Sequence, residues 1–195
     1  MKKILIGLSV IIVILGLVGC ENEDEPDIEI HVDDLFTGGF VGGVFRDEIA
    51  DFEFHLPHGW VYFPEYALID ISMDMRARSG DSIFYTLIAN DQENNIGLVV
   101  IYEEMVDLGQ QDWNANNELL MITDAYSNRF DVREIGEVFM QVIAGHEYEA
   151  VRIYFYDFQG LEDGTLTFFA RRIGNFMLSM SISGPADNDV LDYFR

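Results

Sequence analysis

Apolar and polar residues alternate along several segments of this chain, and such alternation is typical of β-strands with one buried face. In the segment 52–56, for example, Phe52, Phe54 and Leu56 alternate with two polar residues. By the same criterion we predict strands at 44–47, 52–56, 83–89, 96–103, 135–143, 147–157, 165–173 and 176–183. Most of the segments between them are short and rich in Gly, Asn and Asp, so neighbouring strands are expected to pair as antiparallel hairpins.

Three other segments have helical signals. Pro64 stands at the first position of a predicted helix that runs to Arg78 and stops at Gly80. Asp112 is the expected N-cap of a second helix. Its apolar face is spaced by four, three and four residues, at Ala115, Leu119, Ile122 and Tyr126. A short helix is expected from Asp187 to the C-terminus. These elements predict an α+β fold, with an antiparallel sheet that is a meander in its second half and is flanked by helices.

The last three predicted strands have apolar side chains at both sets of alternate positions. We assign one set to a single core face, made of Val151, Ile153, Phe155, Leu166, Phe168, Ala170, Phe176, Leu178, Met180 and Ile182. The other face carries Tyr154, Tyr156 and Phe169 among Arg and Ser residues. Helix cover is the first interpretation of these three aromatic residues, and a patch for a binding partner is the second.

The N-terminus has the pattern of a secretion signal. Lys2 and Lys3 precede an apolar run, Ile4 to Val18, that is shorter than the roughly 20 residues of a spanning helix. Leu17, Val18, Gly19 and Cys20 resemble the lipobox of bacterial lipoproteins at every position. That resemblance implies cleavage before Cys20 and acylation of its thiol, as by palmitate, and two acyl chains suffice for stable anchoring in a bilayer. Because Cys20 is the single cysteine, no intramolecular disulfide can form.

Composition divides the rest of the chain. The segment from Glu21 to Asp34 has eight acidic residues and no Lys or Arg, and four glycines follow between residues 38 and 43. We predict a signal peptide at 1–19, a lipidated acidic and Gly-rich tether at 20–43, and one domain at 44–195. The expected location is the cell membrane, with the chain held by lipid on the extracytoplasmic side.

The charge balance excludes some partners. The chain has 11 basic and 35 acidic side chains, a formal charge of -24, and removal of Lys2 and Lys3 leaves 9 against 35, or -26. Every basic residue after the signal is Arg. So acidic a surface repels polyanions, which argues against nucleic acid as a partner and against electrostatic docking on anionic lipid.

No residue set specifies a reaction. His55 and His58 form an H-x-x-H at a strand end across Pro57, which lacks the three or four ligands that zinc normally takes. Asp91 begins a turn that resembles the start of a calcium loop, but the Gly and the distant Glu of that motif are missing. Ser179 and the alternating serines after it lack the G-x-S-x-G context. No cofactor fingerprint is present, so we expect no cofactor, no metal and no identifiable catalytic residue.

One further aromatic group follows the second strand. Its members are Trp60, Tyr62, Phe63 and Tyr66. They can form an exposed ligand platform, but aromatic residues beside a strand end usually pack on the sheet edge, so we assign them to the core.

Several of these segments together resemble a known family. Phe52 to Trp60, the predicted helix from Pro64, the hairpin around 90–95 and Ile143 to Gly145 are similar to small lipoproteins of Gram-positive bacteria with a PsbP/Mog1-like domain. The resemblance covers residues from about 44 to the C-terminus. It implies an antiparallel sheet with helices on its faces and an accessory or partner-binding role without catalysis.

Three functional hypotheses follow. The first is a membrane-anchored, non-catalytic binding or accessory module, with a protein partner at the cell envelope. The second is an extracytoplasmic hydrolase of cell-wall or glycan material that uses an unidentified carboxylate pair, which requires a cleft with two raised carboxyl pKa values. The third is a carrier of a small molecule or ion, which requires an apolar or acidic pocket.

Overall fold

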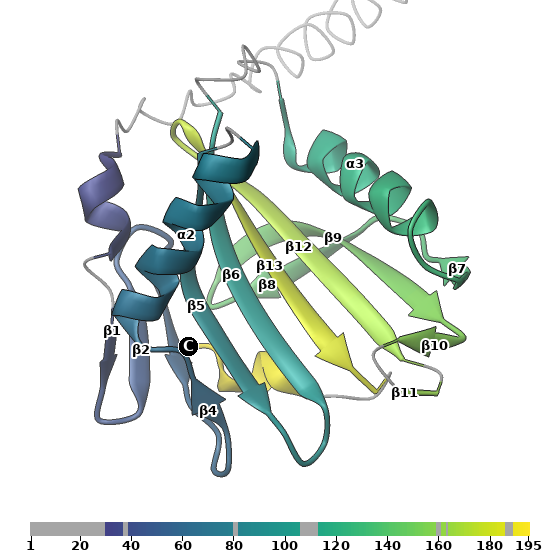
Figure 1. Cartoon of the computed structure of the whole chain (residues 1–195), viewed down its shortest axis with the longest axis horizontal. Coiled ribbons are helices and arrows are strands. Elements are labelled where there is room, and N and C mark those ends of the chain that lie inside the picture. Colours follow the sequence, from purple (N-terminus) through teal and green to yellow (C-terminus); the bar gives the residue numbers. More distant parts are fainter. Residues whose placement is uncertain are drawn as a thin grey trace, which may run out of the picture.

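A computed structural model describes residues 30–36, 39–79, 82–105, 113–158, 161–162, 164–185 and 189–195. It has the predicted α+β fold, with two α-helices on an antiparallel sheet of eight strands and a small sheet of three strands beside it (Figure 1). The small sheet contains β1 (Gly39–Val41), β2 (Val44–Asp47) and β3 (Phe52–His55). The large sheet contains β4 (Val61–Tyr62), β5 (Ile83–Asp91), β6 (Ile96–Glu104), β7 (Val132–Ile135), β8 (Phe139–Ile143), β9 (His146–Phe155), β12 (Thr165–Ile173) and β13 (Phe176–Gly184). A two-stranded ribbon joins β10 (Asp157–Phe158) to β11 (Leu161–Glu162).

The strand order of the large sheet is β4-β5-β6-β13-β12-β9-β7, and β8 also pairs with β9. The strands β8, β9, β12 and β13 form the predicted meander, and the β5–β6 hairpin joins it because β6 pairs with β13. The single strand predicted over 135–143 is wrong. Gly136 N–H donates to the carbonyl of Arg152 (2.8 Å), and the chain between β7 and β8 leaves the ladder there before it pairs again.

The single core face predicted for the last strands is also wrong. Across β12 and β13, Phe168 pairs with Ser181, whereas its neighbour Phe169 pairs with Met180. Directly paired residues share a face and adjacent residues point to opposite faces, so Phe168 and Met180 lie on opposite sides of the sheet. Both faces are buried, and two separate apolar clusters result. Alternation cannot distinguish the faces of a strand when both are covered.

The smaller cluster lies under α3 (Ala115–Ser127). It combines Ala115 and Leu119 of the helix with apolar residues of β9 and β12, such as Val151 and Phe168. Ala115 and Leu119 are buried as predicted, and Ile122 and Tyr126 pack at the margin. The N-cap of α3 is Asn114, whose Oδ1 accepts the N–H of Asn117 (2.9 Å). The expected cap, Asp112, lies outside the described residues.

The helix α2 (Glu65–Ser79) packs along β5, toward the other end of the sheet from α3 (Figure 1). The hydroxyl of Ser72 donates to the carbonyl of Leu68 (2.8 Å) and accepts the N–H of Tyr85 (2.9 Å), which fixes the helix to the strand. The bounds agree with the predicted helix to within a residue, although Gly80 lies outside the described residues. No helix in the described ranges is long and apolar enough to cross a membrane.

The folded part of the chain begins before residue 44. Ile30 and Leu35 are 7% and 5% exposed, and the Ile30 N–H donates to Asn175 Oδ1 (3.2 Å). A 3-10 helix, η1 (Val32–Phe36), leads into β1. Gly42 and Gly43, with φ of +61° and +84°, form the β1–β2 turn and are not part of a tether. The predicted tether boundary is therefore corrected: residues 30–36 and 39–43 belong to the domain, and 20–29 lie outside the described residues.

The C-terminus closes the larger cluster. The predicted terminal helix is the 3-10 helix η3 (Val190–Tyr193), and its expected start, Asp187, lies outside the described residues. Beyond it, Arg195 N–H donates to the carbonyl of Glu53 (2.9 Å), and Glu53 N–H donates to the carbonyl of Arg195 (2.8 Å). Phe194 is 4% exposed and packs on Phe54 of β3, with ring centroids 5.1 Å apart. The chain end thus pairs with the small sheet and holds it against the large one.

A buried carboxylate makes a second link between the two sheets. Asp47, at the end of β2, is 7% exposed and accepts the hydroxyl of Tyr102 of β6 at 2.9 Å. It also accepts the N–H groups of Ile49 and Ala50. Burial raises the pKa of Asp47, although these three hydrogen bonds oppose the rise. Burial also raises the pKa of Tyr102, and the nearby Asp47 carboxylate raises it further.

Candidate functional site

A pocket opens at the corner where the small sheet meets the start of α2. Its volume is about 380 Å³, within the range of small-molecule sites. The walls come from η1, β1, β2, β4, β5 and the first turn of α2, which meet at the left of Figure 1. The lining residues are Leu35, Gly39, Phe40, Val41, Phe45, Tyr62, Phe63, Pro64, Glu65, Leu68, Thr86 and Leu87. Most of them have apolar or aromatic side chains.

Aromatic rings form much of the pocket wall. The rings of Phe40 and Tyr62 lie 4.0 Å apart between centroids, with an interplanar angle of 30°. Tyr62 is 44% exposed and Phe63 is 42% exposed. Large rings that stay this exposed at the mouth of a pocket can stack on a ligand without any rearrangement of the core.

This exposure corrects one sequence interpretation. Of the four aromatic residues assigned to the core, only Trp60 is buried there, and it packs on Phe54 with ring centroids 6.0 Å apart. Tyr62 and Phe63 line the pocket, and Tyr66, at 72% exposed, lies on the first turn of α2. The physical reason is that β4 is a two-residue strand at the edge of the large sheet, where Phe40 of β1 covers the Tyr62 ring only in part.

A buried hydroxyl forms part of the pocket lining. Thr86 sits where the β5–β6 register shifts between Tyr85 and Leu87, and a bulge of this kind re-aims a side chain. Thr86 is 6% exposed, and its Oγ1 has no hydrogen-bond partner among the described residues. An unsatisfied buried hydroxyl costs about 1–3 kcal/mol. The oxygen has almost no accessible surface, so this cost belongs to the wall of the pocket and is not open to a ligand.

The pocket lining includes one acidic side chain. Glu65 is its charged residue and stands in the first turn of α2, exposed to solvent. The basic residue next to the wall residue Phe45 in sequence is Arg46, which pairs with Glu53 (Nε to Oε1, 2.8 Å). Adjacent strand residues point to opposite faces, so the Arg46 side chain is directed away from the pocket.

The predicted partner patch does not form one surface. Phe169 is 2% exposed and belongs to the larger apolar cluster, so it cannot contact a partner. Tyr154 is half-buried, with the Arg133 guanidinium 5.6 Å from its ring centroid, and Tyr156 is 57% exposed. Phe169 is buried because its face of β12 belongs to the larger apolar cluster, which also contains residues of the small sheet and Phe194 near the C-terminus. A patch of Tyr154 and Tyr156 stays a prediction.

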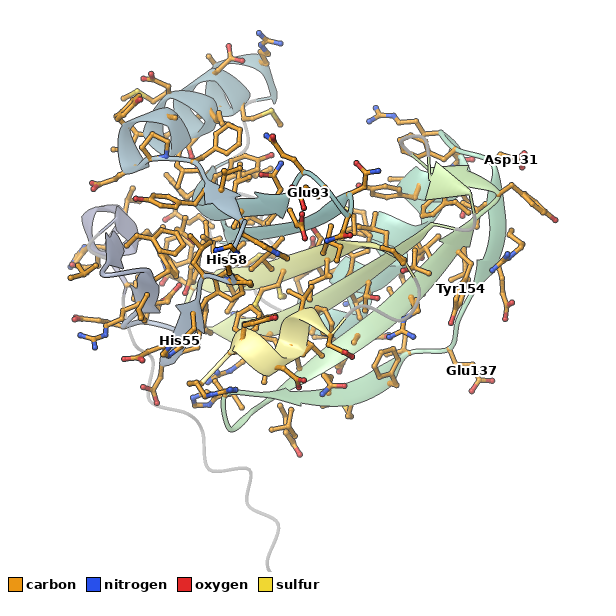
Figure 2. The ribbon with its side chains drawn as sticks, turned by 90° about the horizontal axis from the view of Figure 1, so that it is seen from below. His55, His58, Glu93, Asp131, Glu137 and Tyr154 are labelled. Atoms are coloured by element: carbon orange, nitrogen blue, oxygen red, sulfur yellow. The ribbon has the colours of Figure 1, made fainter. Side chains whose placement is uncertain are left out.

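The other motifs lie apart from the pocket lining. His55 and His58 are near one end of the large sheet and Tyr154 is near the other (Figure 2). His55 Nε2 lies 3.3 Å from Glu53 Oε2, and within the described ranges no three metal-binding side chains come together. Asp91 Oδ1 accepts the N–H of Glu93 (2.9 Å), so its carboxylate stabilises its own turn. The Asn94 amide, which donates to Asp91, lowers the pKa of that carboxyl.

Two carboxyl groups in the described part of the chain have a raised pKa, and they are far from forming a pair. Burial raises the pKa of Asp47 in the larger cluster. Burial also raises that of Glu118 on α3, against the hydrogen bond that Trp113 Nε1 donates to it (3.0 Å). Glu118 lies with the smaller cluster on the opposite side of the sheet. The two groups therefore cannot act on one glycosidic bond, which requires carboxyls within about 5–10 Å.

The fold and the pocket together define a small α+β domain with a ligand-sized aromatic site. LpqN of Mycobacterium tuberculosis, a protein involved in cell envelope biogenesis, is similar in structure, with a TM-score of 0.44 and 12% sequence identity over 73% of this chain and 79% of LpqN. No family profile and no curated protein sequence matches the chain. The resemblance to PsbP/Mog1-like lipoproteins thus stays a prediction.

Proposed function

We propose that this protein is a lipid-anchored binding module on the extracytoplasmic side of the cell membrane, and that it binds a small ligand in the pocket between β1, β4 and α2. The pocket is the observation that carries the proposal. Its exposed rings, Tyr62 and Phe63, leave apolar and stacking interactions unused in the free domain. Binding fits a site whose described lining residues are mostly apolar or aromatic, with Glu65 as the one carboxylate.

The lipobox supports the location. Cys20 precedes Ile30, the first described residue, by ten positions. An extended chain spans at most about 3.3–3.6 Å per residue, so such a tether keeps the domain within about 35 Å of the bilayer. The acidic tether is repelled by anionic headgroups, which favours a domain that stands off the surface.

Replacement of Cys20 by Ala is expected to move the protein from the membrane fraction to the soluble or secreted fraction. Lipidation needs the thiol, and without acyl chains the acidic domain has no affinity for the bilayer. Fractionation of cells with an immunoblot measures this. A Gly19→Ala variant, which keeps a small residue before the cysteine, is the control that should stay in the membrane. A C20A protein that remains there would contradict the anchor.

Ligand binding is tested with a neutral apolar dye, N-phenyl-1-naphthylamine, added to the soluble C20A protein. Its fluorescence is expected to rise as it enters the pocket, and Tyr62→Ala should weaken binding about tenfold, because loss of a stacked ring costs roughly 1–1.5 kcal/mol. Tyr156→Ala removes a comparably exposed ring that lies outside the pocket and should leave the titration unchanged. If the dye does not bind, or binds both variants equally, the pocket is not the site.

A further inference from the structure

We infer that β8 is a docking edge, at which an extended and positively charged segment of a partner protein adds to the large sheet as a further strand. The edge is separate from the pocket, which borders β4 and β5 at the opposite end of the strand order. Three features of β8 carry the inference: backbone groups without partners, exposed apolar side chains, and carboxylates near both of its ends.

The turn after β8 fixes which of its backbone groups pair with β9, the one described strand beside it. Ala144 and Gly145, with φ of +50° and +87°, form a two-residue hairpin turn between Ile143 and His146. The residues that flank such a turn exchange hydrogen bonds, and hydrogen-bonded pairs alternate along an antiparallel ladder. The backbone groups of Ile143 and of every second residue before it therefore point toward β9, and those of the residues between them point to the open edge.

Met140 and Val142 are the residues whose N–H and C=O groups point to the open edge. The side-chain amide of Gln141 donates to the carbonyl of Val142 (3.0 Å), which agrees with a carbonyl that takes no part in the ladder. The N–H groups of both residues and the carbonyl of Met140 have no partner among the described residues. A peptide in extended conformation can bond to all three groups, as in strand addition at a sheet edge.

β8 lacks the features by which proteins usually protect a sheet edge, such as short length, a charged residue, Pro or a bulge. At the other end of the sheet β4 has two residues, and beside β8 the strand β7 contains a register shift between Val132 and Glu134. β8 has five residues, and none of them is charged or is Pro. Met140 and Val142 are 58% and 57% exposed and lie on one face of the strand. Pairing with an added strand would cover both side chains.

The carboxylates near β8 favour a basic partner. Glu137 lies two residues before the strand, and its side chain points away from the sheet (Figure 2). Glu147 of β9 pairs with Val142, near the other end of β8. Both carboxylates are exposed, and neither forms an ion pair with another described residue. Because the mature chain carries a formal charge of -26, from 9 Arg and 35 acidic residues, a second copy is repelled and a basic segment is attracted.

Two arginines near Glu147 are directed toward other groups. The Arg171 guanidinium lies 5.8 Å from the ring centroid of Tyr148. Arg172 Nη1 donates to the carbonyl of Trp113 (3.2 Å). Glu147 can therefore pair with a basic side chain of an added strand.

Three heptapeptides, acetylated and amidated at their ends, test the inference in calorimetric titrations of the C20A protein. The first, Lys-Thr-Val-Thr-Val-Thr-Lys, can place its two Val residues beside Met140 and Val142 and one Lys toward each end of β8. The second has Glu in place of both Lys residues. The third is N-methylated at both Val residues, which removes the N–H groups that face β8. The first should bind about tenfold more tightly than either of the others, because they reverse the charge or remove two backbone hydrogen bonds.

Amide hydrogen exchange, followed by NMR, locates the bound peptide. In the free protein the N–H groups of Met140 and Val142 should exchange quickly, whereas that of Gln141, which belongs to the ladder, should be protected. At saturation with the Lys peptide, exchange at Met140 and Val142 should slow by about fivefold or more. Unchanged exchange at these two residues would place the peptide elsewhere and contradict the inference.

Two pairs of variants assign the binding to β8. Val142→Pro removes the outward N–H without loss of a ladder bond and should weaken binding of the Lys peptide about tenfold. Val142→Thr, which keeps the N–H and the branched shape, should retain the affinity. Glu137→Gln should weaken binding about threefold, as for an exposed ion pair. Glu93→Gln, which makes the same charge change on the exposed β5–β6 turn (Figure 2), should not. Thermal unfolding verifies that each variant is folded, and if Val142→Pro is not, the peptides and the Glu137 variant decide.

The inference is wrong if the Lys peptide does not bind, or if the acidic or the N-methylated peptide binds as tightly. It is also wrong if sedimentation of the C20A protein alone shows a dimer that Val142→Pro converts to monomer, because the partner at β8 would then be a second copy. The proposed function is tested separately, since binding of the dye in the pocket should be the same with and without Val142→Pro.

Discussion

Replacing Asp47 with Ala is expected to lower the free energy of unfolding by about 3 kcal/mol. The change leaves three donors without an acceptor, namely the buried Tyr102 hydroxyl and Ala50 N–H and the partly buried Ile49 N–H. It also removes the contact that joins β2 of the small sheet to β6 of the large one. Equilibrium urea unfolding of the soluble C20A protein measures the loss.

Asp47→Asn is the matched control. The amide oxygen can still accept the N–H groups of Ile49 and Ala50, and the amide nitrogen can donate to the Tyr102 oxygen. Because burial of a charge is also avoided, the variant should lose less than about 1.5 kcal/mol at neutral pH. Equal losses for the Ala and Asn variants would contradict the role assigned to these hydrogen bonds.

The same carboxyl predicts a pH dependence. The pKa of Asp47 is raised by burial, from 3.8, so the folded state holds the proton more tightly than the unfolded state. Its contribution to stability is therefore fully present below pH 3.8 and is lost as pH rises through the folded-state pKa. We compare the free energy of unfolding of the unsubstituted domain with that of the Asp47→Asn variant. The difference should fall as the pH rises from 3.8 through the folded-state pKa. If this free energy difference rose with pH instead, the pKa of Asp47 would be lowered in the folded state and the predicted direction of the shift would be wrong.

Replacing Phe54 with Ala is expected to cost about 4 kcal/mol, the range for a fully buried Phe. Phe54 is 0% exposed and contacts Trp60 and Phe194, with ring centroids 6.0 and 5.1 Å away. The cavity would separate β3 from the C-terminal segment, which pairs with β3 through Arg195. The small sheet and the pocket that it borders should loosen together.

Tyr66→Ala is the control, because the Tyr66 ring is 72% exposed and its loss should change stability by no more than about 0.5 kcal/mol. Hydrogen exchange by mass spectrometry gives a second readout for Phe54→Ala. Faster exchange in β1 to β3 than in β12 and β13 is expected, since the damage lies between the two sheets. Uniform acceleration would contradict a local role for Phe54.

Most secondary structure could be predicted because its signals are local. The strand predicted at 165–173 has the same bounds as β12, and the turns on either side contain the glycines that a reversal needs. The α3 face at Ala115 and Leu119 followed from helical spacing alone. Antiparallel order in the second half followed from the shortness of these turns.

The candidate site could not be predicted in the same way. The pocket combines Phe40, Tyr62 and Thr86, which lie on three strands far apart in sequence. Phe40 came from a stretch interpreted as tether, and Tyr62 lies on the short edge strand β4, where its ring stays partly exposed. Thr86 lies at a bulge of β5 that no spacing in the sequence signals. The sequence pattern placed Phe169 on the same face as the exposed residue Tyr156. The strand register instead pairs Phe169 with Met180, and both side chains are buried.

The sequence by itself determined the class of fold, the helices and strands, and the strongly acidic charge. These properties depend on periodicity and composition within short windows of the chain. Only the tertiary structure decided which elements cover each face of the sheet, where the domain begins, and which side chains line the same pocket. Those properties depend on strand register and on contacts between segments far apart in the sequence, such as the hydrogen bond between Ile30 and Asn175. When both faces of a sheet carry apolar residues, the local pattern of apolar and polar positions does not show which segment packs on which face.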